Sequence, residues 1–174
     1  SYQFTKRESQ FNTEILFSYN DFHEADVLVI SMNFTYEHLK PLEKFIMSLK
    51  RKEKKIVLLS KTNKYKSKKF PLQTPFDMYV MNNLSNRDKV TSKDLFQLKK
   101  VQYKSRINTD KINFNLYKIA EKYNIIFLNK NDFLCDEINK ECDVLTDKNK
   151  KIYYDDHHYT LSGAKRSEEH TSEL

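Results

Sequence analysis

The fold class of this chain is decided by one apolar stretch, Asp26-Val27-Leu28-Val29-Ile30-Ser31-Met32. A short continuous run with β-branched members is typical of a strand buried on both faces of a parallel sheet. Apolar residues then recur at helical spacing from about Tyr36 to Lys54, with Pro41 near the first turn, where proline is tolerated. A second apolar run, Ile56 to Ser60, completes a strand-helix-strand unit of the kind that builds parallel sheets.

The rest of the chain repeats the order helix and then strand. Apolar residues at near-helical spacing predict a short helix over about residues 11–22. Residues 61–90 contain two prolines and no clear period, so we expect a long loop there. A capping-box pattern at Thr91 predicts one helix start, and Thr109 precedes a second helix that leads into an apolar strand at residues 125–128. These patterns predict an α/β protein.

Length and composition limit the possible classes. The 174 residues suffice for one domain, and the content of 39% hydrophobic residues predicts a folded protein. The net charge of +7 comes from lysines that are mixed with acidic residues, and the chain has no nucleic-acid motif, so we expect no nucleic-acid partner. No apolar run approaches the ~20 residues of a membrane span. A basic binding module without chemistry stays open as an alternative.

Groups that can carry chemistry gather in one block, Asp155-Asp156-His157-His158-Tyr159-Thr160-Leu161-Ser162-Gly163-Ala164. An Asp three residues before a His can accept a hydrogen bond from the Nδ1–H of that His. This bond fixes the tautomer and leaves Nε2 to act as a base. His158 is therefore the candidate catalytic base and Asp155 its partner. A solvated loop without function is the alternative interpretation of so short a motif.

This block carries a family resemblance. Asp155 and His158, followed by Thr160 and by a helix that opens at Gly163-Ala164, resemble the last conserved block of SGNH hydrolases. Residues 25–165 resemble more closely the C-terminal extracytoplasmic SGNH domains attached to membrane-bound O-acyltransferases of family 3, in which a Cys pair also lies just before the Asp/His block. The resemblance implies a three-layer, flavodoxin-like parallel sheet flanked by helices.

The resemblance also implies an oxyanion hole and a nucleophile. Ser31-Met32-Asn33-Phe34 stands where typical SGNH enzymes have Gly-x-Asn-Asp, so Asn33 is the candidate oxyanion donor, although an Asn after a strand is often just a turn residue. The nucleophilic Ser of the family comes from a Gly-Asp-Ser block. This sequence cannot supply that block because Gly163 is its only glycine. We therefore expect that the first strand or strands are missing and that the fragment is inactive alone.

The two cysteines, Cys135 and Cys142, allow three interpretations. They could form a disulfide, remain free thiols, or join Asp155, His157 and His158 in a zinc site. Structural zinc sites favour Cys pairs two to four residues apart, which this pair does not match. A disulfide, which the resemblance also implies, would add roughly 2.5 kcal/mol and indicate an oxidising compartment. We therefore predict a disulfide and no metal.

The resemblance implies a function and a location. An SGNH-type domain would accept an acyl group, such as acetyl, on its Ser and pass it to a hydroxyl of a cell-envelope glycan such as lipopolysaccharide or peptidoglycan. A free-standing SGNH carbohydrate esterase is the nearest alternative. No cofactor is expected. The expected partners are the glycan and an acyl donor, reached through a membrane acyltransferase domain of the same polypeptide at the periplasmic side of the bacterial inner membrane.

The expected domain organisation has three parts. Residues 1–25 would be a partial linker or helix, and residues 26–165 a partial SGNH-like domain. Residues 166–174 match the translation of AGA TCG GAA GAG CAC ACG TCT GAA CTC, a common sequencing-adapter read, so we expect this tail to be an artefact.

Overall fold

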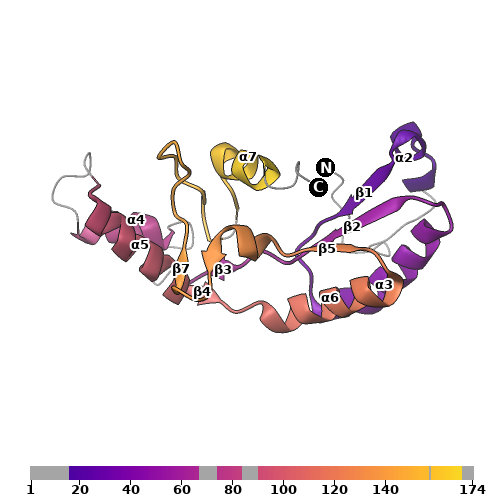
Figure 1. The fold of residues 1–174 in the computed structure, drawn as a ribbon, viewed down its shortest axis with the longest axis horizontal. Coiled ribbons are helices and arrows are strands. Elements are labelled where there is room, and N and C mark those ends of the chain that lie inside the picture. The colour runs from indigo at the N-terminus through magenta and orange to yellow at the C-terminus, as the bar shows by residue number, and fades with distance from the viewer. Residues whose placement is uncertain (1–15, 67–73, 84–89, 157, 170–174) are drawn as a thin grey trace. The chain divides into compact units, whose positions relative to one another are not determined.

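The computed structural model describes residues 16–66, 74–83, 90–156 and 158–169 (Figure 1). The chain forms two compact units. One comprises residues 1–61 and 109–129, and the other comprises residues 62–108 and 130–174.

The first unit is a parallel sheet covered by helices. Its strands are β1 (Val27–Ile30), β2 (Lys55–Leu59) and β5 (Ile126–Leu128), paired in parallel in the order β1-β2-β5. Its helices are α2 (Asn20–Glu24), α3 (Tyr36–Lys50) and α6 (Asp110–Tyr123). The helices α3 and α6 lie on the same side of the strands (Figure 1). The predicted α/β class with a parallel sheet is confirmed.

The core of this unit lies between the sheet and the two long helices. Leu42 and Ile46 of α3, Leu58 of β2 and Leu116 of α6 are completely buried in one cluster. The helical residues stand four apart on α3, which places them on one face of that helix. The periodicity seen in the sequence therefore corresponds to real packing, and burial of these side chains stabilises the unit by about 2 kcal/mol each.

Strand β1 differs from the prediction. Val27 and Val29 are 44% and 60% exposed, whereas Leu28 and Ile30 pack against the core. Successive side chains of a strand point to opposite faces, and α3 and α6 cover the same face of this sheet. The expected burial of β1 on both faces is therefore wrong.

Two helix boundaries also differ. The helix α3 ends at Lys50, four residues earlier than predicted, and Glu53 follows with a φ of 56°, a left-handed conformation that does not continue a helix. The helix predicted over residues 11–22 begins outside the described residues, and the structure has the five-residue α2 near its end.

The described residues of the second unit form short strands, three α-helices and one 3-10 helix. The strands are β3 (Lys64–Tyr65) with β4 (Arg106–Ile107), and β6 (Cys135–Asp136) with β7 (Glu141–Cys142), each pair antiparallel. The helices are α4 (Pro75–Asn83), α5 (Ser92–Lys104), the 3-10 helix η1 (Lys130–Phe133) and α7 (Leu161–Glu169). The helix α5 begins after Thr91 with the predicted capping box.

Within the segment over residues 61–90, for which a long loop was predicted, the described residues form β3 and α4. The helix α4 begins with Pro75, a position at which the missing N–H of proline costs nothing. Before it, the Thr74 N–H and hydroxyl donate to the Asp77 carboxylate, at 3.0 and 2.9 Å, and the Asp77 N–H donates back to Thr74. This is a capping box, and the proline that indicated a loop is part of a helix start.

A buried amide joins α6 to the end of β2. The Asn113 Oδ1 accepts a hydrogen bond from the Lys61 N–H at 2.8 Å, and its Nδ2 donates to the Lys61 carbonyl at 3.0 Å. The Lys61 Nζ donates in turn to the Phe34 carbonyl at 2.7 Å. The turn that follows β1 and the segment that follows β2 are therefore held by one network of side chains.

Replacing Asn113 tests this network. Asn113→Ala removes both bonds to Lys61 and leaves a partly buried backbone N–H and carbonyl without these partners, so the free energy of unfolding should fall by about 1–3 kcal/mol. Urea unfolding followed by circular dichroism measures the change. Asn115→Ala is the matched control, because Asn115 is only half-buried and its Nδ2 donates to the Lys111 carbonyl within α6 at a solvent-exposed place. Equal stability of the two variants would contradict the proposed role of Asn113.

Candidate active site

The structure brings Asp155 and His158 together. The Asp155 Oδ2 lies 2.8 Å from the His158 Nδ1, and its Oδ1 accepts the backbone N–H of His158, also at 2.8 Å. Asp155 is only 7% exposed, whereas the His158 side chain is 65% exposed. The carboxylate is thus buried under the turn while the imidazole faces solvent.

This geometry suits a base that acts on an external hydroxyl. A carboxylate that accepts from Nδ1–H stabilises the tautomer in which Nε2 carries the lone pair, and it also stabilises the imidazolium that forms after proton transfer. The exposed ring can approach a large substrate. Asp155 and His158 therefore have the arrangement that the sequence motif predicts, while their catalytic role stays a prediction.

The backbone closes the loop that carries this pair. Tyr153 and Tyr159 form an antiparallel bridge, and the Tyr154 N–H donates to the His158 carbonyl at 2.7 Å. From β3, the Tyr65 N–H donates to the Asp156 carbonyl at 2.9 Å. The loop is therefore held both by its own ends and by a strand distant in sequence.

Three tyrosine rings pack beneath this loop. The ring centroids of Tyr65 and Tyr153 are 4.8 Å apart, those of Tyr153 and Tyr159 are 5.1 Å apart, and the Tyr65 hydroxyl donates to Tyr153 at 3.1 Å. Burial raises the pKa of Tyr159 to about 12 and also raises the pKa values of Tyr65 and Tyr153. All three hydroxyls therefore stay protonated at neutral pH, and this layer is structural support without charge.

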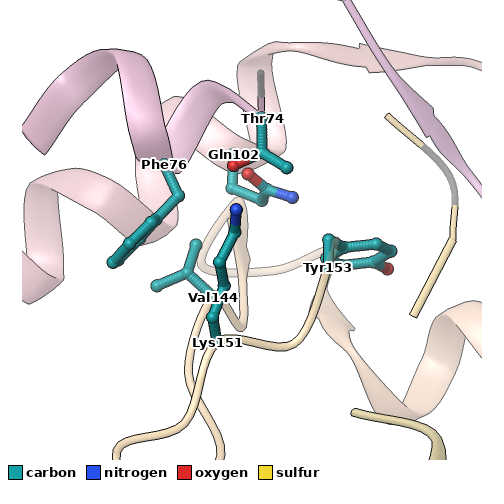
Figure 2. A pocket seen from close by; sticks show the side chains of 6 residues that line it. All are labelled: Thr74, Phe76, Gln102, Val144, Lys151 and Tyr153. Carbon is teal, nitrogen blue, oxygen red and sulfur yellow. The ribbon is translucent and has the colours of Figure 1, made fainter. Parts of the chain in front are cut away.

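The strand-like segment before the loop is fixed to α4. The Lys151 Nζ lies 2.7 and 2.6 Å from the two carboxylate oxygens of Asp77. Lys151 and Tyr153 line a small pocket with Thr74, Phe76, Gln102 and Val144 (Figure 2). This pocket leaves no room for a ligand, so we interpret it as a packing contact.

The end of the motif fixes the start of α7. The Thr160 hydroxyl donates to the Lys151 carbonyl at 2.5 Å and accepts the Gly163 N–H at 3.1 Å. A Cβ at Gly163 would lie 2.2 Å from the carbonyl oxygen of Ile152. Only glycine allows α7 to approach the Ile152 backbone so closely. This explains why the only glycine of the sequence stands at position 163.

Gly163→Ala should therefore destabilise the second unit. The added methyl group forces the backbone of α7 or of Ile152 to move, which costs about 1–3 kcal/mol in the free energy of unfolding. Thermal unfolding measures the effect. Lys165→Ala provides the control, because Lys165 is on the same helix and is exposed. An alanine variant at position 163 as stable as the control would show that the close approach can relax at no cost.

Asn33 lies in the first unit, after β1, and it is exposed between half-buried Met32 and buried Phe34. Asp155 and His158 belong to the second unit. The role of Asn33 as an oxyanion donor stays a prediction.

The cysteines lie in the second unit. Cys135 and Cys142 face each other across β6 and β7 and form a disulfide with an S–S distance of 2.03 Å. Both are buried in a cluster that includes Tyr65 and Tyr153. Among the described residues, which exclude His157, no group of three or more His, Cys, Asp or Glu side chains could hold a metal ion.

Sequence reasoning missed several residues that hold the site. Tyr153 and Lys151 were not singled out and the packing of Tyr65 beneath the loop was not predicted, although tyrosines stand on both sides of residues 155–158 at Tyr153, Tyr154 and Tyr159. This local enrichment of aromatic residues was a usable signal for a packed loop. Nothing near Tyr65 in the sequence indicates its contact.

Comparison with known families agrees with this site. The family described as "SGNH domain (fused to AT3 domains)" matches residues 4–172, and the chain therefore belongs to the SGNH domain family. It is a hydrolase- or acyltransferase-like domain of a family described as fused to AT3 domains, and this description gives the family the context of a membrane protein. Searches of curated proteins and of solved structures found no match. In the part of the chain that the structure describes, no helix has the length and apolar character to cross a bilayer.

Proposed function

We propose that this chain is part of an SGNH-type O-acyltransferase domain that transfers an acyl group, most simply acetyl, to a hydroxyl of a cell-envelope glycan. The observation that carries the proposal is the hydrogen bond from the solvent-facing His158 ring to the buried Asp155 carboxylate. Family membership supports the acyl chemistry.

The proposed reaction has two steps. In the first, the His158 Nε2 takes the proton of a serine hydroxyl as its oxygen attacks the acyl donor, and the leaving group departs with that proton. In the second, His158 takes the proton of a glycan hydroxyl, which attacks the acyl-serine, and the proton then returns to the serine oxygen. The amide of Asn33 would stabilise the oxyanion formed in each step.

In this proposal the serine belongs to a Gly-Asp-Ser block outside the given sequence. The family takes it from a Gly-Asp-Ser block, and the only glycine of this sequence is Gly163. The acyl donor would reach the domain through the membrane acyltransferase part, at the periplasmic face of the membrane. If water replaces the glycan hydroxyl in the second step, the same residues catalyse ester hydrolysis, which is the activity of the esterase alternative.

Substitution of the pair tests the proposal in the full-length protein with its membrane domain. His158→Ala should abolish transfer of radiolabelled acetyl to envelope glycan, and Asp155→Ala should lower the rate about a thousandfold or more, because a triad His without its carboxylate is poorly oriented. The control is His23→Ala, an exposed histidine of α2. Normal transfer by His158→Ala would exclude His158 as the base.

The chain by itself should be inactive. Residues 1–165 without a serine block cannot form the acyl intermediate, so we expect no hydrolysis of a generic acetyl ester above the rate in buffer. An assay of acetate release measures this. Hydrolysis by the chain that persists unchanged in His158→Ala would contradict the SGNH interpretation of residues 155–164.

A further inference from the structure

A pocket of about 420 Å³ lies in the second unit. It shares no lining residue with the packing contact shown in Figure 2. Its walls come from the middle of α5, from η1 and from the β6–β7 hairpin. The charged and aromatic side chains of its lining are those of Lys99, Asp132, Phe133, Asp136, Glu141 and Asp143. The volume falls within the usual range of pockets for small ligands.

The charge of this pocket is opposite to that of the chain. Four carboxylates and the Lys99 ammonium group give the lining a formal charge of −3, whereas the whole chain carries +7. The Lys100 Nζ lies 3.7 Å from the Glu141 carboxylate and reduces the charge of the lining and its ion-pair partner to −2. A basic protein that gathers carboxylates around one hollow attracts cations to it and repels anions from it. The negative charge of the lining therefore restricts the class of ligand more than the shape of the pocket does.

Two of the four carboxylates, those of Asp136 and Asp143, are held in place before any ligand binds. The Lys99 Nζ lies 2.8 Å from the Asp143 Oδ1, and the Asp136 Oδ1 accepts the N–H groups of Ile138 and Asn139, both at 2.9 Å. The Cys135 disulfide closes the same hairpin. A ligand would therefore meet a preformed set of acceptors, which lowers the entropic cost of binding.

The spacing of these groups favours an organic ligand over a metal ion. No three metal-binding side chains of the described residues converge closely enough to hold an ion, so the acceptors surround a larger space. Carboxylates accept several hydrogen bonds from hydroxyl or ammonium donors. Phe133 adds part of an aromatic ring to the wall, which suits the C–H face of a sugar ring.

We propose that this pocket binds one sugar unit of the acceptor glycan and selects a unit that is neutral or bears an amino group over a unit that bears a carboxylate or phosphate. That the ligand is a glycan rests on the proposed function. The charge selection rests on the lining of the pocket.

A matched series of sugars tests the selection. Glucosamine, glucose and glucuronate share one ring and differ in charge, and at about pH 6 the amine is protonated and the carboxylate ionised. Titration of the ¹⁵N-labelled full chain, followed by amide chemical shifts, should show binding at the pocket residues in the order glucosamine, glucose, glucuronate. Glucosamine should bind at least about tenfold more tightly than glucuronate. Glucuronate binding as tightly as glucose, or no sugar binding at all, would overturn the proposal.

Two conservative variants connect the selection to the pocket. Asp132→Asn and Glu141→Gln each remove one negative charge with little change of shape, and each should weaken glucosamine binding about three- to tenfold. Asp147→Asn, an exposed acid outside the lining, should leave binding unchanged. Melting temperatures identify any variant that fails to fold, and the other variant then decides. Unchanged glucosamine binding in a folded pocket variant would overturn the proposal.

These outcomes are independent of the catalytic proposal. Loss of acyl transfer in His158→Ala together with unchanged sugar binding in the pocket variants would leave the proposed function intact and reject the pocket. Charge-selective binding together with normal transfer by His158→Ala would reject the base and retain the pocket.

Discussion

Both oxygens of the buried Asp155 carboxylate bind His158, one through its backbone N–H and the other through its ring Nδ1. A buried carboxylate is costly unless it is hydrogen-bonded, so the turn cannot open without exposing or unpairing this charge. The same two bonds orient the exposed ring. These two hydrogen bonds therefore both stabilise the turn and orient the proposed base. The surrounding contacts hold the turn in place.

That support is shared with the acidic pocket. The buried cluster beneath the turn of Asp155 and His158 contains Tyr65 and Tyr153 and also Leu134 and the disulfide cysteines, and Leu134 and Cys135 also line the pocket. The disulfide hairpin thus packs against the floor of the turn while it shapes the pocket wall. Because well-packed cores transmit strain, a change in the hairpin should affect both features together.

The sequence was sufficient for features with a local cause. The strands β1, β2 and β5 follow from apolar runs, α5 from its capping box at Thr91, and the Asp155–His158 contact from a spacing of three residues. Contacts between segments that are distant in the sequence are not indicated by any local sequence pattern. Asn113 and Lys61 are 52 residues apart, and Tyr65 and Tyr153 are 88 residues apart. The helix α4 was missed because its first residue, Pro75, was interpreted as a breaker.

The turn after β1 departs from the family pattern in sequence and is held by other interactions. Phe34 stands where typical SGNH enzymes have Asp, and it is completely buried in the core. A carboxylate at that place would have to be desolvated, whereas the phenyl ring gains free energy from burial. The Lys61 Nζ holds the Phe34 carbonyl, and Asn113 holds the backbone of Lys61. Apolar anchoring and this network therefore present Asn33 to solvent without the acid, and the substitution by Phe34 does not by itself argue against an oxyanion role for Asn33.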